Sequence, residues 1–183
     1  EVYHQITFNN YVSTSFLQFS NSKDKLIVIN SASKSFNMTG WRIGWITHPE
    51  ELGSHIAKLV QITTTGVPEF LQNGLVSALE NHTSITNEIR KNLKKSRDIM
   101  FDRLVTWKKV ECSIPEAAFY AFFKVEGIKD SLDFAKKLIL ETNVGVAPGI
   151  AFGTSGEGHL RICFAAKESL SLIHISEPTR QRV

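Results

Sequence analysis

The stretch Leu26-Ile27-Val28-Ile29-Asn30-Ser31-Ala32-Ser33-Lys34 decides the fold class. Its first four residues form a continuous apolar run rich in β-branched side chains, which is typical of a strand covered on both faces in an α/β sheet. The small polar residues after this run predict a loop at the carboxyl end of the strand, where open α/β sheets bind their ligands. Lys34 therefore stands at a position where a ligand is expected.

A lysine at this position can hold a ligand covalently. A Schiff-base lysine needs a fixed position and an amine that loses its proton near neutral pH, and a loop behind a buried strand supplies both. Taken alone, a lysine in a serine-rich loop is more often a solvated surface side chain. The residues that follow Lys34 decide between these two interpretations.

Arg42 follows eight residues later, inside the apolar stretch Trp41-Arg42-Ile43-Gly44. We expect a strand here, and a guanidinium in a nearly buried strand needs an anionic partner, which a phosphate provides bidentately. A structural salt bridge is the alternative. Ser31 can donate its hydroxyl to the same phosphate, and Ser33 can do so too or can simply fit a tight loop.

The rest of the chain predicts further strands and helices. The expected strands span residues 2–8, 26–29, 41–46, 119–125, 144–146 and 159–164. The expected helices begin at His48-Pro49-Glu50-Glu51, span Pro68 to Leu79, follow the apolar stripe Ile85, Ile89, Leu93, Met100 and Leu104, and span Ser131 to Glu141. Basic residues line the other side of the long helix, namely Arg90, Lys91, Lys94, Lys95, Arg97 and Arg103. Acidic residues interrupt them, so we expect a solvated helix face and not a nucleic-acid surface.

These elements predict an α/β protein with two parts. Residues 1–80 are expected to belong to one domain, residues 81–105 to a long interdomain helix, and residues 106–169 to a small α+β domain. Residues 170–183 fit no continuation of that domain. They resemble the translation of a transposase adapter used in preparing sequencing libraries, so we interpret them as an artefactual tail.

The composition excludes several classes of protein. A chain of 183 residues that is 42% hydrophobic and 21% charged is typical of soluble globular proteins, and its net charge of +3 calls for neither nucleic acid nor a membrane as partner. Cys112 and Cys163 are isolated, which favours free thiols in a reducing compartment, and the scattered histidines predict no metal site. The chain starts at Glu1 without a leader, so we expect the natural N-terminus to lie upstream.

The run Ser31-Ala32-Ser33-Lys34, followed by Met38-Thr39-Gly40-Trp41-Arg42-Ile43-Gly44, resembles the pyridoxal-phosphate attachment motif of class I/II (fold-type I) aminotransferases. Three further stretches resemble the same family in the same order, up to about residue 169. They are Glu1-Val2-Tyr3, which lacks the aspartate that precedes it in the family, Pro115 to Tyr120 with Ala117 in place of a usual glycine, and Pro148-Gly149 through Phe152-Gly153 to Arg161.

The resemblance implies pyridoxal 5′-phosphate as cofactor and a role for each matching residue. Lys34 would bind the cofactor and act as general acid and base, Tyr3 would donate to its phenolic oxygen, and Arg42 with Ser31 and Ser33 would hold its phosphate. Arg161 would bind the α-carboxylate of the substrate. The implied reaction transfers an amino group between an L-amino acid and a 2-oxo acid in a cytoplasmic homodimer, with aspartate and 2-oxoglutarate as the first expectation.

Two alternatives remain open on the same scaffold. A pyridoxal-phosphate-dependent C–S lyase performing β-elimination would keep Lys34, Arg42 and Arg161, and a transcription regulator could use such a domain to sense the cofactor. The aspartate that would hold the pyridine nitrogen and the preceding half of the large domain are absent from the sequence. We therefore expect this chain, expressed as written, to be an inactive fragment with its true C-terminus also missing.

Overall fold

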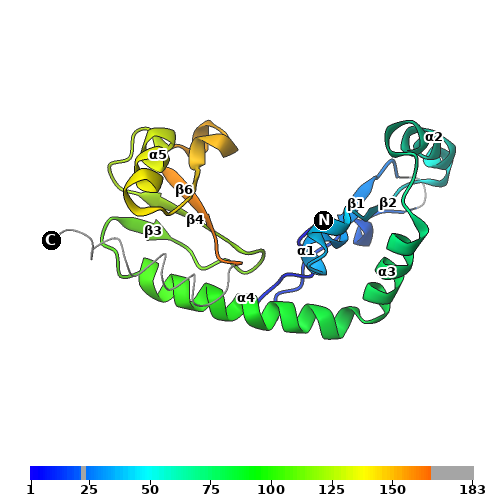
Figure 1. Cartoon of the computed structure of the whole chain (residues 1–183), viewed down its shortest axis with the longest axis horizontal. Coiled ribbons are helices and arrows are strands. Elements are labelled where there is room, and N and C mark those ends of the chain that lie inside the picture. Colours follow the sequence, from blue (N-terminus) through cyan, green and yellow to red (C-terminus); the bar gives the residue numbers. More distant parts are fainter. Residues whose placement is uncertain (22–23, 166–183) are drawn as a thin grey trace. The chain divides into compact units, whose positions relative to one another are not determined.

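The computed structural model describes residues 1–21 and 24–165 of the chain. Its α-helices are α1 (Ala32–Ser35), α2 (Gly53–Thr64), α3 (Glu69–Glu80), α4 (His82–Leu104) and α5 (Ser131–Thr142) (Figure 1). Its strands are β1 (Val28–Ser31), β2 (Gly44–Thr47), β3 (Val110–Cys112), β4 (Tyr120–Val125), β5 (Ala147–Pro148) and β6 (His159–Cys163). Short 3₁₀ helices span Phe16–Gln18, Thr39–Trp41, Glu50–Leu52, Gly149–Phe152 and Thr154–Gly156. The predicted tail, residues 170–183, lies outside the described residues.

The chain divides into two compact units, Glu1–Arg90 and Lys91–Val183, so the division falls inside α4. The first unit carries the antiparallel pair β1–β2, joined by α1 and the 3₁₀ turn Thr39–Trp41. The second unit carries a four-stranded antiparallel sheet in the order β3-β4-β6-β5, together with α5. Both units are mixed α and β, as the sequence predicts.

The predicted strand 26–29 forms, but its burial differs from the prediction. Val28 and Asn30 are buried in β1, whereas Ile27 and Ile29 are 48% and 59% exposed. The expectation that this strand is covered on both faces is therefore wrong for the described residues. A two-stranded hairpin buries alternate side chains, because successive residues of a strand point to opposite faces.

The predicted strand 2–8 does not form. Residues 2–5 make a turn, in which the backbone N–H of His4 donates to the Glu1 carbonyl at 3.3 Å and that of Ile6 donates to the Tyr3 carbonyl at 2.8 Å. These local bonds use the backbone groups that a ladder would need. The segment is held instead by its end, since the N-terminal amine donates to the Ile29 carbonyl at 2.6 Å.

Helix α3 begins where the sequence predicts, whereas α2 begins at Gly53, after a 3₁₀ turn at the predicted start, and α1 forms where a loop was expected. Pro49 precedes the 3₁₀ turn that leads into α2, and Pro68 occupies the N-cap position of α3. Proline fits at a helix start because it has no N–H to leave unpaired there. The second strand begins at Gly44 and not at Trp41, because the Thr39–Trp41 turn occupies the first part of the predicted range.

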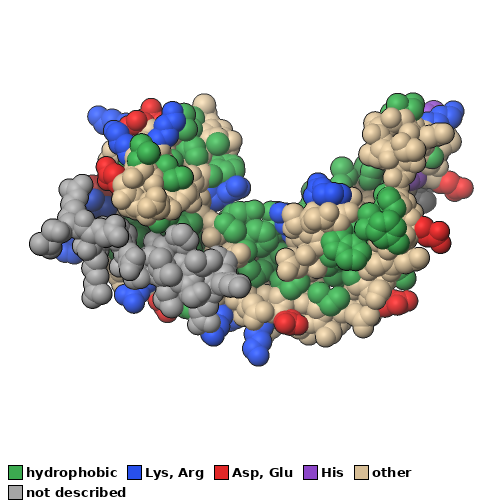
Figure 2. Space-filling view, in the orientation of Figure 1, with side chains coloured by type: hydrophobic (Ala, Val, Ile, Leu, Met, Phe, Trp, Pro, Cys, Tyr) green, Lys and Arg blue, Asp and Glu red, His purple; other side chains and the backbone are tan. Residues whose placement is uncertain are grey.

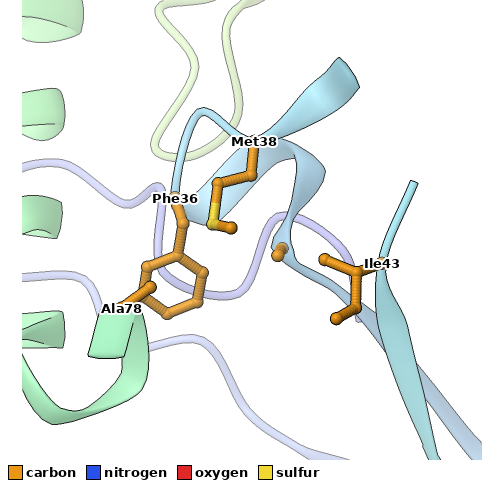
Figure 3. Packing of buried hydrophobic residues seen from close by; sticks show 5 residues of the cluster. Phe36, Met38, Ile43 and Ala78 are labelled. Carbon is orange, nitrogen blue, oxygen red and sulfur yellow. The ribbon is translucent and has the colours of Figure 1, made fainter. Parts of the chain in front are cut away.

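A small apolar core lies under this hairpin turn. Phe36 and Met38 follow α1, Ile43 precedes β2, and Ala78 comes from α3; together with Ala32 all are buried (Figure 3). Leu71, Leu75, Trp45 and Ile85 pack against this cluster as partly buried side chains. The core therefore anchors the segment that carries Lys34 and Arg42 to α3 and to the start of α4.

The predicted long helix is confirmed as α4, which contains the whole apolar stripe. One of its basic residues departs from the expected solvated face. Arg97 is only 3% exposed, and its guanidinium donates to the Asp98 carboxylate at 2.8 and 3.0 Å and to the Pro115 carbonyl at 3.1 Å. Burial disfavours the charge on Asp98, but the bonds from Lys94 and Arg97 outweigh it and lower the pKa of that carboxyl.

The second unit confirms most of its predicted elements. Strand β4, helix α5 and strand β6 match the predictions closely, whereas the expected strand 144–146 is wrong: the ladder forms at Ala147–Pro148. The reason is register, since β6 pairs Arg161 with Ala147 and Leu160 with Pro148. The residues of β3 were not predicted as a strand.

The sheet of the second unit has two different faces. Phe123, Leu160 and Ile162 on one face border an apolar cavity of about 310 Å³ that is also lined by α4 and α5. The other face carries Tyr120, Phe122 and Arg161, which alternate with the first set along the same strands. Apolar side chains also reach the surface in both units (Figure 2).

Candidate active site

Lys34 lies in α1, a single helical turn that directly follows β1. Its side chain is partly buried, while Ala32, Ser33 and Ser35 of the same turn are buried. The turn starts with Ser31, whose hydroxyl oxygen accepts a hydrogen bond from the Ser33 backbone N–H at 3.1 Å. Such an N-cap fixes the first turn of a helix, so the backbone of Lys34 has a defined position at the end of the strand.

Ser31 and Ser33 both make hydrogen bonds within the chain. The Ser31 hydroxyl also lies 3.5 Å from the Ile43 carbonyl, and the Ser33 carbonyl accepts from the Thr39 hydroxyl at 3.0 Å. These bonds order the Lys34 turn against the Arg42 turn. That either hydroxyl donates to a phosphate stays a prediction.

Arg42 is exposed and lies in a turn, so the expectation of a nearly buried strand is wrong at this residue. Its backbone is left-handed, with φ 54° and ψ 41°. One guanidinium N–H donates to the Thr39 carbonyl at 2.9 Å, and no acidic partner stands among the described residues. A guanidinium has five N–H donors, so most of them remain available to an anion.

The structure brings the Arg42 turn directly beside the Lys34 turn. The Ala32 backbone N–H donates to the Ile43 carbonyl at 3.1 Å, and Ser31 pairs with Gly44 across β1 and β2. A side chain at Gly44 would place its Cβ 2.5 Å from the Asn30 carbonyl oxygen, so only glycine allows this approach. Lys34, Arg42, Ser31 and Ser33 therefore lie on two short turns that contact each other.

The segment that carries Tyr3 contacts α1 through its neighbour Val2. The Ser35 hydroxyl donates to the Val2 carbonyl at 3.3 Å, which ties the N-terminal turn to α1. Tyr3 itself is partly buried. The structure therefore places the five predicted residues of the first unit on segments that contact one another: Tyr3, Ser31, Ser33, Lys34 and Arg42.

Asn30 was not predicted as a site residue. Its side chain is 8% exposed, and its Oδ1 atom is buried without a hydrogen-bond partner in the structure. An unpaired buried acceptor costs free energy, about 1–3 kcal/mol, and is the kind of atom that a bound group satisfies. No sequence signal marked it, since asparagine next to a serine-rich loop reads as part of the loop.

These residues fit a phosphorylated aromatic aldehyde such as pyridoxal 5′-phosphate. Lys34 offers the amine that condenses with an aldehyde, Arg42 offers a fork of donors for a phosphate, and Asn30 offers an unsatisfied polar atom nearby in sequence. Among the residues that the structure describes, no cluster of histidine, cysteine or acidic side chains could hold a metal ion. The described helices include none that is long and apolar enough to cross a membrane.

Arg161 belongs to the second unit and sits in the middle of β6. Its guanidinium carbon lies 4.3 Å from the ring centre of Tyr120 and 4.3 Å from that of Phe152. Within the described part of the chain its side chain makes no hydrogen bond or ion pair, although the residue is partly buried. That Arg161 binds the α-carboxylate of a substrate stays a prediction.

The Arg161 strand is preceded by a tightly packed turn. Gly149 and Gly156 approach each other so closely that a Cβ on either would overlap the other's backbone. Glu157 then accepts from the backbone N–H groups of Ser131 at 2.6 Å and Gly158 at 3.0 Å. These bonds, led by the one from Gly158, lower the pKa of the Glu157 carboxyl.

Comparison with known proteins decides the family. A sequence model of the family "Aminotransferase class I and II" matches residues 1–173. The chain belongs to this family. Its fold is that of the fold-type I aminotransferases: it superposes on the aromatic aminotransferase from Pyrococcus horikoshii OT3 with a TM-score of 0.88 at 28% identity, covering 95% of this chain and 47% of that one.

Two curated aminotransferases illustrate the sequence similarity. LL-diaminopimelate aminotransferase from Natranaerobius thermophilus is 39% identical over 160 residues, which cover 87% of this chain and 41% of that protein. Probable N-acetyl-LL-diaminopimelate aminotransferase from Bacillus subtilis is 33% identical over 168 residues, covering 90% and 41%. The chain thus spans about two fifths of the length of these aminotransferases.

Proposed function

We propose that the protein containing this chain is a pyridoxal-phosphate-dependent aminotransferase that transfers an amino group between an L-amino acid and a 2-oxo acid. The observation that carries the proposal is the contact between the Lys34 turn and the Arg42 turn, made through the Ala32–Ile43 hydrogen bond. This contact brings the turn that carries the Lys34 amine against the turn that carries the Arg42 guanidinium, and membership of the aminotransferase family supports a cofactor-binding role for both.

Each proposed residue has a distinct task. Lys34 holds the cofactor and, once its amine is free, moves the proton at the substrate α-carbon. Arg42 binds the phosphate with the help of Ser31 and Ser33, and Tyr3 donates to the phenolic oxygen. Pyridoxal phosphate, when bound, supplies the electron sink for the α-carbon.

Arg161 is the residue that we propose to bind the α-carboxylate of the substrate. A partly buried guanidinium with no ion pair in the described residues needs an anion, and a carboxylate matches its fork. We propose that residues 1–80 contribute to the large domain and 106–169 to the small domain, with residues 81–105 between them. The intact protein is proposed to be a cytoplasmic homodimer; the free thiols of Cys112 and Cys163 support a reducing compartment.

The substrate is the finer part of the proposal. The stretch Met38 to Arg42 suggested aspartate with 2-oxoglutarate, and aspartate aminotransferases from Thermus thermophilus and Rhizobium meliloti are among the structural neighbours, at 25–28% identity. The names of the curated relatives support a different donor, LL-diaminopimelate. Both amino acids carry a second carboxylate, so we propose a dicarboxylic amino acid as the donor.

Borohydride reduction of the full-length protein with its cofactor tests the central assignment. Reduction should fix a pyridoxyl group on the peptide that contains Lys34, and the Lys34→Ala variant should remain unlabelled. Label on another lysine, or no label on the unsubstituted protein, would refute the role of Lys34.

A second experiment identifies the reaction. The same protein is incubated with L-aspartate or LL-diaminopimelate and 2-oxoglutarate, and the new amino acid is measured. Transfer of the amine to the oxo acid supports an aminotransferase with ping-pong kinetics. Release of pyruvate and ammonia from a cysteine-like substrate would instead identify a β-eliminating lyase, and cofactor binding without turnover would favour a sensor domain.

A further inference from the structure

Arg161 is held by two aromatic rings that come from opposite sides of its strand. In the sheet order β3-β4-β6-β5, strand β6 lies between β4 and β5. Tyr120 belongs to β4, and Phe152 ends the 3₁₀ turn that follows β5. Each ring centre lies 4.3 Å from the guanidinium carbon, within the range of a cation–π contact.

We propose that Tyr120 and Phe152 are positioning residues, which fix the Arg161 guanidinium so that its N–H edge receives the α-carboxylate of the substrate. The proposal rests on the function proposed above for Arg161. We refer to the two rings as the Arg161 clamp. Neither ring is proposed to touch the reacting atoms.

The geometry explains why rings suit this task better than an acidic partner. The five N–H donors of a guanidinium lie in its plane, whereas an aromatic ring engages the face of the plane. A carboxylate neighbour would compete with the substrate for the donors. The clamp leaves the donors unused and still restrains a long side chain that otherwise has many rotamers.

A third ring, that of Phe122, lies beside the clamp. Phe122 packs edge-on against Phe152, with ring centres 5.8 Å apart, and stacks on His159 at 5.0 Å with an interplanar angle of 6°. Phe122 is the residue directly opposite Arg161 in the β4–β6 ladder. The Phe122 ring nevertheless makes no contact with the Arg161 guanidinium, so Phe122 is not part of the clamp.

Steady-state kinetics of the full-length holoenzyme test the proposal, with the L-amino acid that gives the fastest transfer. Phe152→Leu should raise KM about threefold to tenfold and leave kcat within about twofold, as expected when binding common to ground and transition states is lost. Phe152→Tyr keeps an aromatic face and should restore KM. Phe122→Leu is the matched control, because it removes a similarly exposed phenyl ring beside Arg161 that does not face it.

Two further measurements distinguish a loss of Arg161 positioning from a nonspecific disruption of the enzyme. The amine obtained by removing the carboxylate from the same substrate should react equally with the unsubstituted enzyme and Phe152→Leu. Calorimetric titration with 2-oxoglutarate should show a Kd weakened by the same factor as KM. Should Phe152→Leu fail to fold, Tyr120→Leu provides the same comparisons from the other side of the strand.

The outcomes separate the clamp from the proposed function. An active enzyme in which Phe152→Leu leaves KM unchanged, or in which Phe122→Leu has an equal effect, overturns the clamp while the function stands. A protein that transfers no amino group overturns the function, and the clamp is then decided by the calorimetric Kd alone. Absence of 2-oxoglutarate binding to the unsubstituted protein overturns the clamp as well.

Discussion

Seven non-glycine residues of the described chain have positive φ, and their identities show where the backbone carries a cost. Four are asparagines, which tolerate this region because their side chains bond locally. Arg42, Thr65 and Ala118 lack that advantage, and Arg42 keeps its conformation at the proposed phosphate site. Such a left-handed residue is retained where surrounding contacts require it, which agrees with a binding role for the Arg42 turn.

Ala118 allows a test of this cost. The family resemblance places the usual glycine at position 117, but the positive φ, 64°, belongs to Ala118. Ala118→Gly should therefore stabilise the protein by about 0.5–1 kcal/mol, because relief of the left-handed strain exceeds the added freedom of the unfolded chain. Ala117→Gly, the matched control, should destabilise it by a similar amount. Urea denaturation measures the free energy of unfolding of both variants. If Ala117→Gly proved the more stable variant, the backbone strain would lie at position 117.

Glu157 gives a prediction about pH. Its folded pKa is lowered from 4.5 by the bonds from Gly158 and Ser131, so its contribution to stability is complete above that value and is lost as pH falls through the folded pKa. Glu157→Gln should lower the melting temperature near neutral pH, and the difference from the unsubstituted protein should vanish once the pH falls below the folded pKa of Glu157. Glu116→Gln, on an exposed loop residue, should leave the pH profile unchanged. Parallel profiles for all three proteins would contradict the role of Glu157.

At the scale of elements, local pattern predicted most helices and strands but not how the site turn is made. Periodicity located α3, α4 and α5, because an apolar stripe depends only on neighbouring residues. The stretch Trp41 to Ile46 reads as a strand on the same basis. Its first residue, Trp41, instead ends a 3₁₀ turn that Arg42 caps, and the Trp41 ring lies against α3, a contact that no local pattern encodes.

The contact between Trp41 and Gly74 explains why a glycine occupies the middle of α3. A Cβ at Gly74 would overlap the Trp41 ring, so a glycine stands in the middle of α3 despite its poor helix propensity. Gly74→Ala should destabilise the protein by about 1–3 kcal/mol through overpacking, and in the holoenzyme it should weaken cofactor binding through the adjacent Arg42. In a Trp41→Ala background the same substitution should stabilise by up to about 1 kcal/mol.

Gly53→Ala is the control for helix propensity, since Gly53 opens α2 and its Cβ would meet only the His48 ring at an ordinary 3.5 Å. It should be neutral or stabilising. If Gly74→Ala behaves like Gly53→Ala in thermal denaturation, the Trp41 contact does not shape the turn.

At the scale of the whole molecule, the sequence predicted the family but not the environment of the proposed site residues. Lys34, Arg42 and Arg161 are proposed on ordered motifs, which can be found in a sequence without knowledge of the fold. The unpaired Asn30 oxygen and the rings of Tyr120 and Phe152 beside Arg161 were not predicted, since burial and ring contacts arise between segments that are distant in sequence. The burial of β1 also depends on which other elements pack on its two faces, and a run of apolar residues cannot specify that.

The exposed apolar side chains of the first unit lead to the last prediction. Val12, Phe19, Ile62 and Phe70 are each more than 70% exposed, and apolar area left in contact with water favours association. The isolated 183-residue chain should therefore self-associate and melt without a cooperative transition, whereas the full-length protein should give a single discrete oligomer.

Sedimentation velocity and calorimetry measure both properties. A variant with Ile62→Lys and Phe70→Glu should associate less than the unsubstituted chain, because charge at these positions opposes apolar contact. Leu138→Lys, which places a charge in the apolar cavity of the second unit, should not improve solubility and should destabilise that unit. A monodisperse chain with a sharp melting transition would show that this surface is compatible with an independently stable unit, and that the proposed large domain needs no further layer to fold.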